Sequence, residues 1–238
     1  MCTRYIAPEA GDIERHWQVG ARNVPNWARE LYPRYAGPFI RAVRDAPRPE
    51  RELVVGLWSL VPWFAKSARL SYPTANARSE ELGAKASYRQ PWARGQRCII
   101  PALAFFEPNW ESGRHVPWRF GRSDGQAWGL AGLWNTWVDP ASGEVVESYT
   151  MLTINADAHP LMRRMHKPDP ARPPALQDNR SVVPIEDADV EAWLHAPLVE
   201  AAQLLRLAPA ERFVAEPAGP AVKLAAPPAG GLFAADPD

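Results

Sequence analysis

Prolines interrupt this chain so often that long helices are excluded. They make up 26 of the 238 residues, and a proline inside a helix removes one backbone hydrogen bond and clashes with the preceding turn. We therefore expect short helices and a sheet at the centre of the fold. Runs of β-branched, aromatic and other apolar residues predict strands, and they occupy residues 53–58, 98–106, 127–137, 149–154 and 181–185.

Helical patterns are fewer and lie before, between or after these runs. They cover residues 10–19, 79–85, 187–194 and 198–207, with Asn76 or Ser79 available as N-cap of the second. Asp124-Gly125 and Ser142-Gly143 predict hairpin turns, and the proline-rich, charged residues 167–179 predict a loop. The sequence therefore indicates an α+β domain with a central sheet and peripheral helices.

The length fits one domain or two small ones. We assign residues 1–214 to a single domain and residues 215–238, which are rich in Ala, Pro and Gly, to a flexible tail. No apolar run approaches the roughly 20 residues that span a bilayer. The start lacks a signal-peptide pattern, and two cysteines fit a reducing compartment. We expect a cytoplasmic protein and a monomer.

Charge and motif content limit the function classes. The 27 basic and 27 acidic residues give no net charge, which argues against general attraction to polyanions but leaves a local basic groove open. No Cys-x-x-Cys, His-x-x-x-His or His-Glu-x-x-His pattern is present. A glycine-rich loop ending in Lys-Ser/Thr is also missing, which disfavours nucleotide hydrolysis. We therefore predict neither a metal nor another cofactor.

Cys2 is the residue with the most distinctive chemistry. Removal of Met1 would leave Cys2 with a free α-amine and a thiol on adjacent carbons. The amine, with an ordinary pKa of about 7.7–8.0, is partly neutral at cellular pH and can attack an aldehyde. The thiol can then close onto the imine carbon and form a five-membered thiazolidine. A structural alternative stays open, in which Cys2 packs as a small hydrophobe.

Four other polar positions have both a functional and a structural interpretation. Asn76 and Arg78 can clamp a sugar and a phosphate, or serve as a cap and a surface charge. Glu107 ends an apolar run, where burial would raise its pKa and make it a proton donor, unless it turns toward water. His166 precedes the predicted loop and can shuttle protons or be solvated there, and His159 is a competing candidate.

Several short segments, taken in order, resemble the SOS-response-associated peptidase (SRAP) family, whose members crosslink to abasic sites in single-stranded DNA. The segments are residues 1–5 (MCTRY), 58–63 (WSLVPW), 76–80 (NARSE), 97–101 (RCIIP) with Phe106-Glu107, 131–134 (AGLW), 153–156 (TINA) and His166. Two features depart from the family pattern. Thr3 stands where glycine is usual, and a proline-rich insertion separates His166 from residues 180–184, where many members continue directly with Arg-Met-Pro.

The resemblance implies a single SRAP-like domain with a barrel-like β core, and a role for each polar position. Cys2 is implied as the covalent nucleophile, Asn76 as the residue that orients the opened sugar, and Glu107 with His166 as the acid/base pair. The implied partner is single-stranded DNA containing abasic sites, which the crosslink would shield. The implied DNA contacts are Arg4, Trp58, Pro62, Arg78, Arg89 and Arg180, with Trp58 and Pro62 in a segment that wedges against a base.

Two rival functions remain. The first is a thiol peptidase that uses Cys2 and His166. In its narrowest form, its activity is only the removal of Met1. The second is a non-covalent single-strand binder that uses tryptophans and arginines alone, with an affinity that falls with salt.

Overall fold

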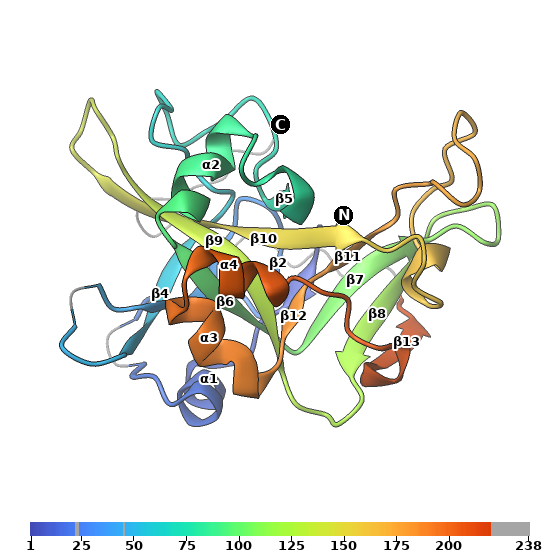
Figure 1. Ribbon diagram of the computed structural model, residues 1–238, viewed down its shortest axis with the longest axis horizontal. Coiled ribbons are helices and arrows are strands. Elements are labelled where there is room, and N and C mark those ends of the chain that lie inside the picture. Colours follow the sequence, from blue (N-terminus) through green and yellow to red (C-terminus); the bar gives the residue numbers. More distant parts are fainter. Residues whose placement is uncertain (22–23, 45, 220–238) are drawn as a thin grey trace.

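Two β-sheets flanked by short helices make up the computed structural model, which describes residues 1–21, 24–44 and 46–219 (Figure 1). The larger sheet contains β3 (Ala36–Ala42), β4 (Arg51–Trp58), β5 (Asn76–Arg78), β6 (Arg97–Ala102), β9 (Trp128–Val138), β10 (Val145–Asn155), β11 (Arg180–Val182) and β12 (Pro184–Ile185). The smaller sheet contains β1 (Tyr5–Ile6), β2 (Glu30–Leu31), β7 (Ala104–Asn109), β8 (Val116–Arg122) and β13 (Phe213–Pro217).

Short helices cover the outside of these sheets. Helix α2 lies at the top of Figure 1, and the other three gather in its lower half. They are α1 (Ala10–Trp17), α2 (Ala86–Ala93), α3 (Val190–His195) and α4 (Leu198–Gln203). In the described part of the chain, no helix has the length and apolar character that crossing a bilayer requires.

Strand β10 closes five strands of the larger sheet into a barrel. Its residue Tyr149 pairs antiparallel with Trp134 of β9 on one side and parallel with Trp58 of β4 on the other. Strands β4, β3, β6 and β9 follow one another in the sheet, so the five strands form a closed ring, which protects their edges. The expected α+β fold with a barrel-like core is therefore confirmed.

A pair of buried tyrosines holds the smaller sheet against the barrel. The hydroxyl groups of Tyr5 on β1 and Tyr149 on β10 are 2.6 Å apart, and both residues are fully buried. The ring of Tyr5 also packs edge-on against Trp58, with 4.9 Å between centroids. Gly37 of β3 lies against both hydroxyls, and a Cβ at this position would come within 2.8 Å of the Tyr5 oxygen. The junction therefore requires glycine here.

Strands with strong apolar patterns are confirmed, and two other expectations are wrong. The run 98–106 is not one strand, because β6 ends at Ala102 and β7 begins at Ala104 in the other sheet. Leu103 forms the corner, where its N–H donates to the Ile6 carbonyl (2.7 Å). The turn at Asp124-Gly125 likewise joins β8 to β9 in different sheets, whereas Ser142-Gly143 does lie in a hairpin, between β9 and β10.

The prediction of a helix at residues 79–85 is also wrong. Only Ser79–Glu81 form a short 3-10 turn, with Arg78 at the N-cap position, and Asn76 belongs to strand β5. The true helix, α2, follows and contains Pro91. Sequence reasoning treated proline as a helix breaker, but Pro91 lies inside α2 and does not end it, at the cost of one backbone hydrogen bond.

The helices near the other end of the domain are shorter than expected. Residues 187–194 form a 3-10 turn (Asp187–Asp189) that leads into α3, and α4 stops at Gln203, short of 207. The boundary expected at residue 214 falls inside β13, which pairs with β8 along its whole length. Most of the expected tail, residues 220–238, lies outside the described residues.

Replacing Gly37 with alanine should destabilise the fold, because the added methyl group must displace the tyrosine pair. Overpacking of a tight core costs about 1–3 kcal/mol, and we expect a loss of that size in urea unfolding. Gly83→Ala is the matched control, since nothing lies within 4 Å of a Cβ there. Equal stability of the two variants would contradict the close packing described at the junction.

Candidate active site around the N-terminal cysteine

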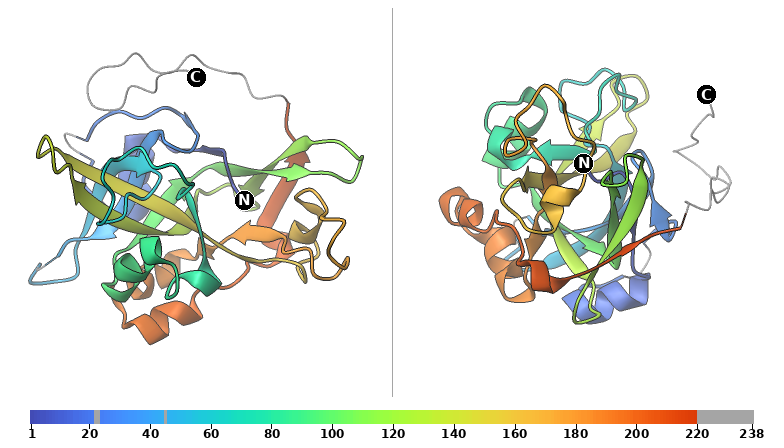
Figure 2. Two further views of the ribbon diagram at one scale, coloured as in Figure 1. Left: turned by 90° about the horizontal axis from the view of Figure 1, so that it is seen from above. Right: turned by 90° about the vertical axis from the view of Figure 1, so that its right-hand side faces the viewer.

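Strand β1 places the N-terminal residues at the junction between the two sheets. Tyr5 pairs with Leu31 of β2 and with Phe105 of β7, so the residues just before it are fixed from both sides. Cys2 is fully buried, and its thiol donates to the Arg4 carbonyl (3.3 Å). In both views of Figure 2 the N-terminus lies beside the yellow-orange segment that carries residues near 166.

Asn76 reaches the cysteine from the barrel side. Strand β5 runs parallel to β10, with Asn76 opposite Met151. The Asn76 side-chain N–H donates to the carbonyl of Cys2 (2.7 Å), while its buried Oδ1 has no hydrogen-bond partner among the described residues. One amide therefore fixes the Cys2 backbone and keeps a free acceptor, which is suited to a sugar hydroxyl.

Glu107 places a carboxylate beside the chain start from strand β7. Its side chain is completely buried, and neither oxygen accepts a hydrogen bond from any described residue. The nearest cationic groups are the α-ammonium of Met1, 3.5 Å from Oε2, and the His166 ring, whose Nε2 lies 3.7 Å from the same oxygen. Burying a carboxylate without hydrogen-bond donors costs free energy. A proton or a cation bound at Glu107 would offset this cost.

His166 has a defined tautomer because of its neighbours. Its Nε2 is 2.9 Å from the carbonyl of Arg180, and a carbonyl can only accept, so the Nε2 of a neutral ring carries the hydrogen. Its Nδ1 then presents a lone pair to the Met1 amine, 3.2 Å away. The backbone of His166 is left-handed (φ 70°) and its N–H donates to the Pro108 carbonyl (2.6 Å), which holds the ring over Glu107.

The competing candidate His159 has a structural role. Its Nδ1 accepts the backbone N–H groups of Leu161 (3.2 Å) and Met162 (3.0 Å), and its Nε2 lies 3.0 Å from the Ala208 carbonyl. Both ring nitrogens are therefore engaged with backbone. His159 fixes the start of the short 3-10 turn that leads to His166.

The environment keeps the Cys2 thiol protonated while Met1 is attached. Burial, together with the nearby charge of Glu107, raises the pKa of the Cys2 thiol from 9.0 to about 12, against smaller opposing effects of backbone hydrogen bonds. A thiolate is the reactive form of cysteine. The site as it stands therefore does not present an activated thiol.

An open cavity of about 650 Å³ adjoins the site. Thr3, Phe106 and Glu107 contribute to its wall, and Arg4 lies over the Phe106 ring with 3.9 Å between guanidinium carbon and centroid. Arg4 is also paired with Glu30. Its wall therefore combines aromatic and cationic groups, a combination that can hold a nucleotide.

The structure separates the expected DNA contacts into exposed and buried ones. Arg89 is exposed on α2, and Arg78 is 40% exposed with ion pairs to Asp178 (2.6 Å) and Glu81 (3.7 Å). Trp58 and Pro62 are buried, and the Trp58 ring N–H donates to the Ala75 carbonyl (2.8 Å). The expectation that these two offer a surface to a base is therefore wrong.

Two neighbouring aromatics, which sequence reasoning did not single out, are exposed instead. Trp63 is 63% exposed and Phe64 is 42% exposed, and their rings meet edge-to-face with 5.7 Å between centroids. They directly follow the buried Pro62. The motif WSLVPW contained the signal, but the sequence did not reveal which of its two tryptophans faces outward.

Arg180 is the other corrected contact. Its side chain is 5% exposed and donates to Glu80 (2.7 and 3.2 Å), to Asp178 (3.2 Å) and to the Thr153 carbonyl (2.9 Å). Its Nε–H has no partner among the described residues but is buried, so the side chain offers no accessible donor to a phosphate. Its carbonyl instead holds His166, so Arg180 and its partner Glu80 position the imidazole.

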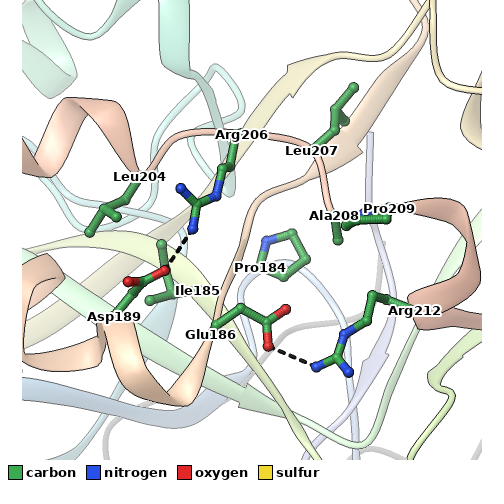
Figure 3. Close-up of a pocket in the computed structure, with 10 residues that line it drawn as sticks. All are labelled: Pro184, Ile185, Glu186, Asp189, Leu204, Arg206, Leu207, Ala208, Pro209 and Arg212. Carbon is green, nitrogen blue, oxygen red and sulfur yellow. Dashed lines mark hydrogen bonds and ion pairs between the residues drawn. The ribbon is translucent and has the colours of Figure 1, made fainter.

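A smaller cavity of about 290 Å³ lies apart from this site, between the segments 184–189 and 204–212 (Figure 3). Arg206 pairs there with Asp189 (2.8 Å) and Arg212 with Glu186 (2.7 Å). None of the residues Cys2, Asn76, Glu107 and His166 lines this cavity. Across the described residues, no group of three or more His, Cys, Asp or Glu side chains is arranged to hold a metal ion.

A barrel joined to a second sheet, with a buried cysteine at position 2 facing a carboxylate, an imidazole and an amide, defines a class of protein organised around its own chain start. Residues 1–224 match the model of the family described as SOS response associated peptidase (SRAP), and the chain belongs to that family.

Similar proteins carry names that refer to abasic sites. The abasic site processing protein HMCES of Gallus gallus is 28% identical over 236 residues, covering 83% of this chain and 65% of the chicken protein. The abasic site processing protein YoqW of Bacillus subtilis is 30% identical over 139 residues, covering 58% of this chain and 55% of that protein. The chain thus spans just under two thirds of the chicken relative.

Solved structures share the fold. A protein from Bordetella bronchiseptica has a TM-score of 0.79 and 37% identity, covering 92% of this chain and all of that one. A protein from Bacteroides thetaiotaomicron has a TM-score of 0.71 at 20% identity, with 90% of each chain covered, and shows the fold alone.

Replacing Glu80 with glutamine should remove a pH-dependent part of the stability. Partial burial by itself raises the pKa of Glu80, but hydrogen bonds from Arg180 and from backbone outweigh it and lower the pKa from 4.5 to about 2. A depressed pKa stabilises the fold above the unfolded value, and this contribution is lost as pH falls from 4.5 toward 2. The destabilisation by Glu80→Gln should therefore shrink across that window.

Urea unfolding of both proteins from neutral pH down to the acid limit measures this effect. Glu14→Gln, on the exposed side of α1, should show no such trend. A stability difference for Glu80→Gln that is independent of pH would contradict the proposed ion pair with Arg180.

Proposed function

We propose that this protein captures abasic sites in single-stranded DNA by forming a covalent thiazolidine through Cys2. The observation that carries the proposal is the convergence of Cys2, Asn76, Glu107 and His166 from four separate segments around the chain start. The names of the relatives support abasic-site DNA as the substrate class. Shielding the damaged strand from cleavage would be the outcome of the crosslink.

The chemistry begins once Met1 is removed. An abasic deoxyribose exists mainly as a closed hemiacetal, and proton transfer at its ring oxygen opens it to the aldehyde. Glu107 and His166 are placed to move that proton, because both adjoin the N-terminal residues: each lies within 4 Å of the Met1 amine in the unprocessed chain. Asn76 offers its free Oδ1 to a hydroxyl of the opened sugar.

Two bonds then form on one carbon. The Cys2 amine attacks the aldehyde carbon, and loss of one water gives the imine. The thiol adds across the carbon–nitrogen double bond, so that sulfur binds carbon and the thiol proton ends on nitrogen. The amine reacts first, because the thiol can add only to the imine that the amine forms. Glu107, with its unsatisfied oxygens, is the group that can relay the proton.

The exposed side chains of the protein include groups that suit a single strand. Trp63 and Phe64 present exposed rings on which a base can stack, an interaction worth about 1–3 kcal/mol per base that needs no sequence preference. Arg4, Arg78 and Arg89 supply cationic groups for the backbone. We propose that the protein acts as a monomer in the cytoplasm, where its two thiols stay reduced.

Crosslinking to an abasic oligonucleotide tests the mechanism. The oligonucleotide is made with a uracil, treated with uracil-DNA glycosylase, incubated with protein and run on a denaturing gel. Wild type should give a shifted band and Cys2→Ala should give none, while Cys98→Ala, which removes the other buried thiol, should keep it. An undiminished band for Cys2→Ala would reject the mechanism.

A Cys2→Ser variant separates the roles of amine and thiol. It keeps the α-amine but cannot close a thiazolidine, so its imine should survive the gel only after borohydride reduction. Glu107→Gln and His166→Ala should each crosslink about 10²-fold more slowly than wild type, since each variant lacks a proton carrier. DNA binding without any crosslink, insensitive to the abasic aldehyde, would instead favour the non-covalent binder.

Self-removal of Met1 is a second candidate activity, favoured by the contacts of the Met1 amine with His166 (3.2 Å) and Glu107 (3.5 Å). Intact mass spectrometry of proteins made in cells with normal aminopeptidase measures it. Under self-processing, Met1 should persist in Glu107→Gln and His166→Ala. Complete removal in both variants would assign the step to the aminopeptidase, and turnover of unrelated peptides would extend the activity to general proteolysis.

A further inference from the structure

Three arginines converge on one carboxylate at the edge of the site. Asp178 lies 2.6 Å from Nη2 of Arg78, 3.2 Å from Nη1 of Arg180 and 3.7 Å from Nη1 of Arg172. Guanidinium groups arranged in this way bind an oxyanion with two or more oxygens. The three arginines therefore form an anion-binding site that the Asp178 carboxylate occupies.

Only two of the three arginines are accessible to an outside anion. Arg180 is 5% exposed and already shared with Glu80. Arg78 and Arg172 are 40% and 46% exposed. Arg78 also stands two residues after Asn76, whose side chain holds the Cys2 carbonyl. An anion on Arg78 would thus sit next to the reacting sugar, where a DNA phosphate must lie.

The backbone around Asp178 is fixed, so its side chain alone has freedom to leave. The N–H groups of Asp178 and Asn179 donate to the Asp157 carboxylate (3.0 and 2.8 Å). Gln177 pins the rest of the loop by donating to the carbonyls of Arg172 (2.9 Å) and Pro173 (3.0 Å). A change of rotamer would take the carboxylate off Arg78 without moving the loop.

We propose that Asp178 is an internal competitor of DNA: a backbone phosphate beside the abasic site replaces its carboxylate on Arg78, and Arg172 becomes an additional phosphate contact. Both Asp178 and Arg172 belong to the insertion at residues 167–179, so this contact is a property of this chain's own loop. The inference rests on the proposed function, because it requires single-stranded DNA at the site. It assigns the insertion a role in setting DNA affinity.

The test is non-covalent binding of an undamaged single-stranded oligonucleotide, followed by fluorescence anisotropy. Asp178→Asn keeps the shape of the side chain and tolerates the left-handed backbone (φ 60°), but it removes the charge. Loss of one like charge next to a phosphate should tighten binding roughly three- to tenfold at low salt. Glu14→Gln on α1 is the control for net charge alone and should leave binding unchanged.

Two further variants locate the effect. Arg172→Gln should weaken binding and lower the slope of log affinity against log salt by about one. Asp178→Asn should give a smaller gain in an Arg78→Gln background, because Arg172 is then the one accessible arginine of the three for which Asp178 competes. Thermal unfolding of each variant reports whether it is folded.

The outcomes distinguish this inference from the function on which it rests. No binding by wild type, together with no crosslink to abasic DNA, would overturn the proposed function. Binding by wild type with no gain from Asp178→Asn, or an equal gain from Glu14→Gln, would overturn the competitor alone. An unchanged salt slope for Arg172→Gln would remove that arginine from the interface.

Discussion

The unpaired carboxylate of Glu107 is the constraint on which the site depends. A buried charge is tolerated only when a cation or a hydrogen-bond donor compensates it, and no described residue donates to either Glu107 oxygen. The compensating groups are the α-ammonium of Met1 and the His166 ring. The short strand β1 therefore does more than complete a sheet. Its pairing with β7 brings the N-terminal residues close to Glu107, which lies on β7.

Strand β10 organises the other half of the site. Its first part closes the barrel against β9 and β4, and its last part pairs with β5 and β11. Those two neighbours supply Asn76 and the Arg180 carbonyl that holds His166. Glu80 then links them by pairing with Arg180 across β10. The geometry between the amide and the imidazole is thus set by one continuous strand.

The sequence predicted the strongly patterned strands and the four converging residues, and its failures share a cause. Residue type and period indicate that a strand exists but not which sheet receives it, so the corner at Leu103 was invisible. The same limit explains Trp58, Pro62 and Arg180, whose chemistry suits DNA but whose side chains point inward. Sequence reasoning did not single out Asp178 or Glu80, because Asp178 pairs with Arg78 and Glu80 with Arg180 across a long stretch of chain. Thr3, by contrast, is exposed and not left-handed, so nothing there requires the usual glycine.

The neutral net charge bears on how such a protein would select its target. Several cations near the site already have internal anions: Arg4 with Glu30, Arg78 with Asp178 and Arg164 with Glu111. At these positions a phosphate must displace a carboxylate before it gains a contact, which would weaken attraction to undamaged strands. Under the proposed function, the irreversible gain comes from bonds to the aldehyde carbon that only an abasic site offers. Weak electrostatic binding then improves discrimination, because dwell time on ordinary DNA stays short while the covalent step retains the damaged strand.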